Sequence, residues 1–175
     1  IGNYAFEGCL KLVEVINHSS LNILGGYGNI AYYAKEVHTG ESKIVNKDGY
    51  FFYTTGSVNY LVKYVGSDAE LTLPESYKGE SYVIHDYAFS GNDEITIIII
   101  PDSVTNIGNY AFRYCSSLES VTIGNSVTSI GYEAFENCSS LKRLTIGNGV
   151  TSISEYAFSG CDSLTSVTIP DSVTN

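Results

Sequence analysis

Basic residues are scarce in this chain of 175 residues, which carries 9 Lys and Arg against 19 Asp and Glu and has a formal net charge of −10. The imbalance is strongest over residues 84–175, where 3 basic residues stand against 10 acidic ones. A surface that follows nucleic-acid phosphates, or one that docks on an anionic membrane, needs clustered Lys and Arg. The composition therefore argues against both partners, and we expect no direct membrane insertion by this segment.

The sequence also lacks the motifs of common catalytic and phosphate-binding sites. None of H-E-x-x-H, G-x-S-x-G or the glycine patterns of phosphate loops occurs. The histidines are His18, His38 and His85, and the sequence places none of them near a candidate nucleophile. Asp93 and Glu94 are adjacent carboxylates at an expected turn, where neighbouring side chains usually diverge into water. We therefore expect no cofactor and no enzyme, and catalysis is only a distant alternative.

What the sequence does contain is a 23-residue repeat, whose units begin at Ile84, Ile107, Ile130 and Ile153 without a gap. The second of these units reads IGNYAFRYCSSLESVTIGNSVTS. A partial unit, IGNYAFEGCLKLVEVIN, opens the chain at Ile1. Self-similarity at this period is typical of a solenoid, in which each unit packs on its neighbours in the chain.

Each unit has eight fixed apolar positions, and their spacing predicts how the unit folds. In the pattern L-x-x-V-x-I the last three residues alternate inward and outward, as in a half-buried strand. The segment N-Y-A-F is consistent with one helical or 3₁₀ turn that directs Ala and Phe inward. A single unit cannot bury eight apolar side chains alone, so stability must come from stacking. The eight positions in one unit are Ile107, Ala111, Phe112, Cys115, Leu118, Val121, Ile123 and Val127.

This pattern, C-x-x-L-x-x-V-T-I-(P or G)-x-S-V-T-x-I-x-x-x-A-F, resembles the BspA-like leucine-rich repeat family. Four clean units cover residues 84–175, and a partial unit covers 1–16. The resemblance implies a β-rich, right-handed leucine-rich repeat solenoid, with one parallel sheet along one face and short turns or 3₁₀ segments on the other. Because the chain starts and stops at repeat boundaries, we also expect a piece of a longer protein. The expected sheet runs through Val15, Leu71, Ile98, Val121, Leu144 and Val167.

The repeat also explains the four cysteines, which all occupy one small apolar position of the unit. Asn92 takes that position in the unit without a cysteine. Zinc sites need converging ligands at C-x₂₋₄-C spacing, which is absent, so we expect no metal site. We predict buried free thiols rather than disulfides. The cysteines are Cys9, Cys115, Cys138 and Cys161.

A tyrosine-rich insert interrupts the repeat at residues 17–83 and holds nine of the fifteen tyrosines. Alternating aromatic and aliphatic residues around a Gly-containing turn predict an antiparallel hairpin through Phe51–Tyr53 and Tyr60–Tyr64. Residues 28–40 fit a short helix. The sequence LTLPES at 71–76 echoes VTIPDS of the repeats, which predicts a degenerate repeat strand.

Two isoleucines, Ile97 and Ile99, occupy outward positions that are polar in the later units. Two explanations remain open: aromatic residues of the insert partly cover them, or they form an exposed apolar patch that binds a partner. The candidate binding face comprises Ile97, Ile99, Ser120, Thr122, Arg143, Thr145, Ser166 and Thr168. The candidate aromatic residues of the insert are Tyr50, Tyr53, Tyr60 and Tyr64.

The favoured function is an extracellular module that binds a protein or a glycan, because stacked strands form an extended face. The resemblance to the BspA-like family implies a cell-surface location and a part in adhesion. The alternative is a structural spacer or stalk that presents other domains, since residues 107–175 carry mostly small polar groups outside the core. A repeat fold alone does not identify a ligand.

Overall fold

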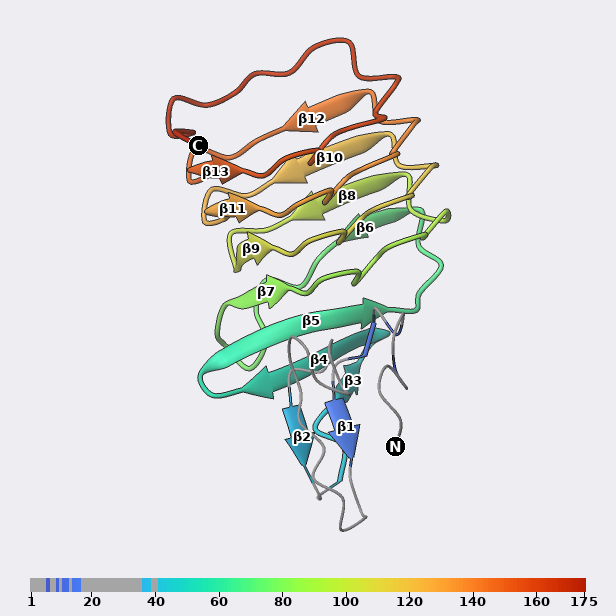
Figure 1. Cartoon of the computed structure of the whole chain (residues 1–175), viewed down its shortest axis with the longest axis vertical. Coiled ribbons are helices and arrows are strands. Elements are labelled where there is room, and N and C mark those ends of the chain that lie inside the picture. Colours follow the sequence, from blue (N-terminus) through green and yellow to red (C-terminus); the bar gives the residue numbers. More distant parts are fainter. Residues whose placement is uncertain (1–5, 7–8, 10, 13, 17–35, 39–40) are drawn as a thin grey trace.

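The computed structural model describes residues 6, 9, 11–12, 14–16, 36–38 and 41–175, and these residues form strands and turns without a helix. Successive turns of the chain, here called rungs, stack along the long axis of the molecule (Figure 1). Two sheets line the stack on opposite sides, and their side chains meet in a shared core. The β-rich leucine-rich repeat solenoid expected from the sequence is thereby confirmed.

The first sheet, called the front sheet, contains four parallel strands in the order β12-β10-β8-β6. Its register agrees with the repeat alignment, because Ile98 pairs with Val121 on one side and with Leu71 on the other. The degenerate repeat strand predicted near residue 71 is therefore a full member of this sheet. The strands are β6 (Glu70–Thr72), β8 (Ile97–Ile100), β10 (Ser120–Ile123) and β12 (Arg143–Thr145).

Two of the six positions predicted for this sheet lie outside it. Val15 pairs with Val37 in a separate two-stranded parallel sheet, made of β1 (Glu14–Ile16) and β2 (Glu36–His38). Val167 lies outside any strand and is 44% exposed, so its predicted burial is wrong. A rung buries its side chains between two neighbours, and Val167 belongs to the last rung, which has a neighbour on one side. Leu144, one rung earlier, is half-buried.

The second sheet, called the back sheet, occupies the side where the sequence predicted turns or 3₁₀ segments. Five of its strands pair side by side and run parallel, in the order β13-β11-β9-β7-β5. The strands contributed by the repeat units have only two to four residues, whereas β5 of the hairpin has seven. The strands are β3 (Val45–Lys47), β4 (Tyr50–Thr55), β5 (Val58–Tyr64), β7 (Tyr82–Ile84), β9 (Val104–Ile107), β11 (Ser129–Ile130) and β13 (Ser152–Ile153).

The predicted hairpin is present as the antiparallel pair β4–β5, in which Tyr53 pairs with Tyr60. Its strand β5 also pairs in parallel with β7, so the hairpin extends the back sheet beyond the first complete rung (Figure 1). One face of the hairpin joins the solenoid core through Phe52, Leu61 and Tyr64. The hairpin therefore covers the first complete rung with one face, while Tyr53 and Val62 of its other face are buried in a second cluster with Ile44, Phe51 and Tyr60.

The helix predicted over residues 28–40 is wrong where the structure tests it, because Glu36–His38 forms strand β2. The rest of that segment, residues 28–35 and 39–40, lies outside the described residues. Most of the partial unit at 1–16 also lies outside them.

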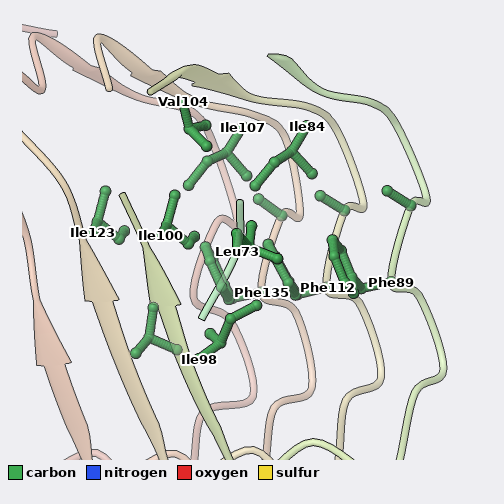
Figure 2. Packing of buried hydrophobic residues seen from close by; sticks show 14 of the residues in the cluster. Leu73, Ile84, Phe89, Ile98, Ile100, Val104, Ile107, Phe112, Ile123 and Phe135 are labelled. Carbon is green, nitrogen blue, oxygen red and sulfur yellow. The ribbon is translucent and has the colours of Figure 1, made fainter. Parts of the chain in front are cut away.

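Aromatic rings form a continuous row through the core (Figure 2). Phe112 stacks between Phe89 and Phe135, with ring centroids 4.8 Å apart on both sides and interplanar angles of 11° and 5°. Phe158 extends the row at 5.3 Å, and Tyr64 of the hairpin meets its other end at 6.0 Å from Phe89. Because the same position of the repeat stacks from rung to rung, phenylalanine rings come into contact. These ring contacts stabilise the core in addition to the burial of apolar surface.

The turn between the sheets is built from left-handed residues rather than from a helix. In one rung these are Tyr110, at φ 58°, and Tyr114, at φ 61°. Hydrogen bonds from the N–H of one residue to the carbonyl three residues earlier close the turns, for example from the Cys115 N–H to the Phe112 carbonyl. Alternate N–H groups then point along the stack and donate to the next rung: Tyr110 to Tyr132 (2.9 Å), Phe112 to Ala134 (2.7 Å) and Tyr114 to Glu136 (2.8 Å).

The cysteines at the repeat position are free, as predicted, with Cys115 and Cys138 buried and Cys161 half-buried. Each of these thiols donates to the carbonyl of a phenylalanine in the preceding rung, as Cys138 does to Phe112 at 3.2 Å. The neighbouring thiols and burial raise the pKa of Cys138 well above its usual range. Cys9 is also free but exposed, so the predicted burial is wrong for Cys9, and it is only partial for Cys161.

We expect native protein at pH 8 to be modified by a maleimide rapidly at Cys9 and very slowly at Cys115 and Cys138, because thiolates react and these two thiols are buried. Peptide mapping by mass spectrometry measures this order. The control is denatured, unreduced protein, which should expose four reactive thiols. A disulfide between any two of them would contradict the assignment.

Candidate functional site: the outer face of the front sheet

The outer face of the front sheet carries the side chains that point away from the core. Strand register aligns them in two rows, as the sequence predicted. One row is Glu70, Ile97, Ser120 and Arg143, and the other is Thr72, Ile99, Thr122 and Thr145. Ile97 and Ile99 thus lie side by side among polar neighbours.

Ile99 is 43% exposed, so the insert does not enclose it, and the partial cover of Ile97 and Ile99 by aromatic residues stays a prediction. The hairpin residues that join the core, such as Phe52, lie with Ile98 and Ile100, whose side chains point to the opposite side of β8. Ile97 is half-buried. The outer face therefore presents one exposed and one partly exposed isoleucine within an otherwise polar surface.

Ser166 and Thr168 are the last two residues of the candidate face, and the structure does not bring them into the sheet. Both are exposed, and the segment around them forms no strand. Figure 1 shows this part of the last rung as a wide loop beyond β12. The part of the candidate face that forms strands therefore ends at Arg143 and Thr145, which are both exposed.

The four candidate tyrosines of the insert pack within the hairpin and do not form an open surface. Tyr53 and Tyr64 are 0% and 7% exposed, and Tyr50 and Tyr60 are half-buried. Tyr64 donates a hydrogen bond to Asp68, and burial together with this bond raises its pKa to about 12. Tyr50 and Tyr64 pack on the solenoid core, whereas Tyr53 and Tyr60 pack in the second apolar cluster of the hairpin.

A second surface feature, which the sequence analysis did not predict, is a row of four tyrosines along the turns. Tyr87 stacks on Tyr110 with centroids 4.6 Å apart, and edge contacts follow from Tyr110 to Tyr132 at 5.6 Å and from Tyr132 to Tyr156 at 5.8 Å. A hydrogen bond with Glu133 raises the pKa of Tyr132 to about 12. The sequence signal for this row was the tyrosine before A-F in three of the four units.

Arg113 connects this row of tyrosines to the next rung. Its guanidinium lies over the rings of Tyr110 and Tyr114, 5.4 and 4.6 Å from their centroids. It pairs with Glu133 at 3.2 Å and with Glu136, both from the following rung. These carboxylates raise the pKa of Arg113, against an opposing effect of burial, and hold the guanidinium in place.

The described part of the chain contains no group of three or more His, Cys, Asp and Glu side chains arranged to hold a metal ion. Within the same residues, no helix has the length and apolar character needed to cross a membrane.

One family model matches this chain. It is described as the BspA type leucine rich repeat region, and it matches in six copies over residues 1–62 and 69–175. That match includes part of the segment interpreted above as an insert, so the proposed division into 1–16, 17–83 and 84–175 stays a prediction. No curated protein matches the chain.

Solved structures of bacterial repeat proteins share the fold. A leucine rich cell surface protein from Faecalibacterium prausnitzii is 33% identical, with a TM-score of 0.66 over 78% of this chain and 39% of that one. A leucine-rich repeat protein from Bacteroides capillosus is 28% identical, with a TM-score of 0.63 over 71% of this chain and 96% of that one. The chain thus spans well under half of the first protein.

Proposed function

Because this chain belongs to the BspA-type leucine-rich repeat family, we propose that it is a binding module of a bacterial cell-surface protein, with a protein or glycan ligand and a role in adhesion. The similar structure from F. prausnitzii is that of a cell surface protein, which supports the location. The ligand contacts the outer face of the front sheet. Stacked rungs give such a face its length.

The observation that carries this proposal is the exposure of Ile99 beside Ile97 on that face. The equivalent positions in the next rungs are polar, so the fold itself does not require isoleucine there. One exposed and one half-buried isoleucine among polar side chains resemble the apolar centre and polar rim of an interface. The rim residues are Thr72, Ser120, Thr122, Arg143 and Thr145.

Replacing both residues, Ile97→Thr and Ile99→Thr, is expected to weaken ligand binding about tenfold or more. Stability should fall by no more than about 1.5 kcal/mol in total, because one side chain is exposed and the other half-buried. Binding is measured on an array of purified extracellular proteins and glycans, and stability by urea unfolding.

Val65→Thr is the matched control, since Val65 is 51% exposed, directly follows strand β5 and belongs to no strand of the front sheet. It should bind as the wild type does. If the double variant and the wild type give equal signals on every ligand, the outer face is not the binding site. Absence of any wild-type signal would favour the alternative function, a spacer that presents other domains, which the small polar residues of the later rungs support.

A further inference from the structure

The outer face of the front sheet changes in charge along the stack. The row that contains Ile97 begins with Glu70 on β6 and ends with Arg143 on β12, and both end residues are exposed. Strands β8 and β10 lie between these two edge strands (Figure 1). An isoleucine therefore lies between a negative end and a positive end of one row.

Two of the three basic residues in 84–175 are neighbours at the positive end, namely Lys142 and Arg143. The Lys142 ammonium pairs with the Glu119 carboxylate at 3.0 Å, and the Lys142 N–H donates to the Glu119 carbonyl at 2.9 Å. The charge of Glu119 is thereby balanced within the sheet, so it does not oppose the approach of an anion to Arg143.

Arg143 carries a positive charge that the chain does not balance. Arg113, the other arginine, pairs with two glutamates, whereas no ion pair between residues that the structure describes includes Arg143. The next rung places Thr165 and Ser166 at the positions of Lys142 and Arg143, so it supplies no carboxylate there. On a chain with a net charge of −10, this exposed guanidinium attracts an anionic group from outside.

The isoleucines and the arginine are close enough for one ligand to contact both. Ile97 and Arg143 lie two strands apart in the same row, which corresponds to about 10 Å between their Cα atoms. Arginine binds a carboxylate through paired N–H groups, and an isoleucine side chain gains from burial against another apolar group. A ligand that matches this face therefore combines a carboxylate with aliphatic side chains.

The isoleucines favour a protein over a glycan as the source of that ligand. Sugar hydroxyl groups lose water when they lie on Ile97 and Ile99, and the two side chains offer no hydrogen bond in return. Aliphatic side chains of a protein carry no such cost, and their burial removes apolar surface of both partners from water.

We propose that the outer face of the front sheet binds an acidic segment of a partner protein. Aliphatic side chains of this segment pack on Ile97 and Ile99, and an aspartate or glutamate pairs with Arg143. Glu70 at the opposite end repels a carboxylate, which orients the acidic part of the segment toward β12. This inference rests on the function proposed above, because it specifies the ligand of the same face.

The probe is an array of short immobilised peptides, tested with the whole chain. Each peptide contains two leucines and one aspartate, at varied spacing, in a background of glycine and serine. Matched peptides carry asparagine or lysine instead of the aspartate. At the best spacing, we expect the aspartate peptide to bind about 2- to 5-fold more tightly than its asparagine counterpart and the lysine peptide to bind most weakly. Added salt should reduce these differences.

Variants of Arg143 test whether the preference for aspartate arises at this residue. Arg143→Gln should bind aspartate and asparagine peptides equally, through the isoleucines alone. Arg143→Glu should reverse the preference, so that lysine peptides bind more tightly than aspartate peptides. Lys47→Gln is the matched control, because it removes one positive charge from an exposed residue of β3, outside the front sheet, and the preference should stay.

Equal binding of aspartate and asparagine peptides to the wild type at every spacing would overturn the inference, as would a preference for aspartate that persists in Arg143→Gln. Arg143-dependent binding of an oligogalacturonate, with no binding of any peptide, would also overturn it and would leave the outer face as a glycan site. Failure of the proposed function gives a different result, in which Ile97→Thr with Ile99→Thr binds every peptide as the wild type does.

Discussion

Replacing Phe112 with alanine is expected to lower the free energy of unfolding by about 3–5 kcal/mol. Phe112 is 1% exposed and stacks on a phenylalanine ring on each side, so its removal leaves a cavity between two rungs and ends two ring contacts. Adjacent rungs cannot close this space, because the hydrogen bonds that join them hold their separation. Urea unfolding followed by far-UV circular dichroism measures the loss.

Phe158→Ala is the matched control for this cavity. Phe158 occupies the same position of the repeat, but it is half-buried and contacts one phenylalanine ring, that of Phe135 at 5.3 Å. Its replacement should cost about 1–2 kcal/mol, because less surface leaves the core. Equal losses at the two positions would contradict a stack whose stability depends on contacts between neighbouring rungs.

Leu61→Ala should destabilise the protein by about 2–5 kcal/mol and loosen the rung next to the hairpin first. Leu61 is 0% exposed and joins the solenoid core, and its strand pairs with β7. Its carbonyl also accepts a hydrogen bond from the His85 N–H at 2.9 Å. Hydrogen exchange measured by mass spectrometry should rise over residues 82–92 and stay low over residues 130–150.

Val58→Ala serves as the control for this prediction, because Val58 lies on the same strand and is 38% exposed. It should change stability by about 0.5 kcal/mol or less. Faster exchange in all rungs of Leu61→Ala would show that the stack unfolds as one unit. Unchanged exchange in the first rung would show that the hairpin does not stabilise it.

Strand register was predictable from residue identity alone. Equivalent positions of a repeat face the same way, and this alone aligns Ile98 with Val121 and with Leu71 on neighbouring strands. The free cysteines followed from the same reasoning, since a position that accepts asparagine in one rung is not part of a disulfide framework. The hairpin was predictable from its alternating residues and glycine-containing turn.

The position of the hairpin was not predictable, because alternation shows that a strand has two faces and does not say what each face meets. Its core-facing residues Phe52 and Leu61 pack against the first complete rung, while Ile99 on the outer face is 43% exposed. The row of tyrosines along the turns was also missed. Tyrosines at the same position of the repeat have the same sequence signature whether they are buried, as Tyr87 is, or exposed, as Tyr156 is.

By itself, the sequence determined the period, the inward and outward positions of each rung and the family, because these depend on order along the chain. Tertiary structure decided how many sheets form, which rung the hairpin covers, and which equivalent residues reach solvent. Those properties depend on which parts of the folded chain lie next to each rung. Val121 and Val167 occupy the same position of the repeat, yet one is 1% and the other 44% exposed, because a rung lies on both sides of the first and on one side of the second.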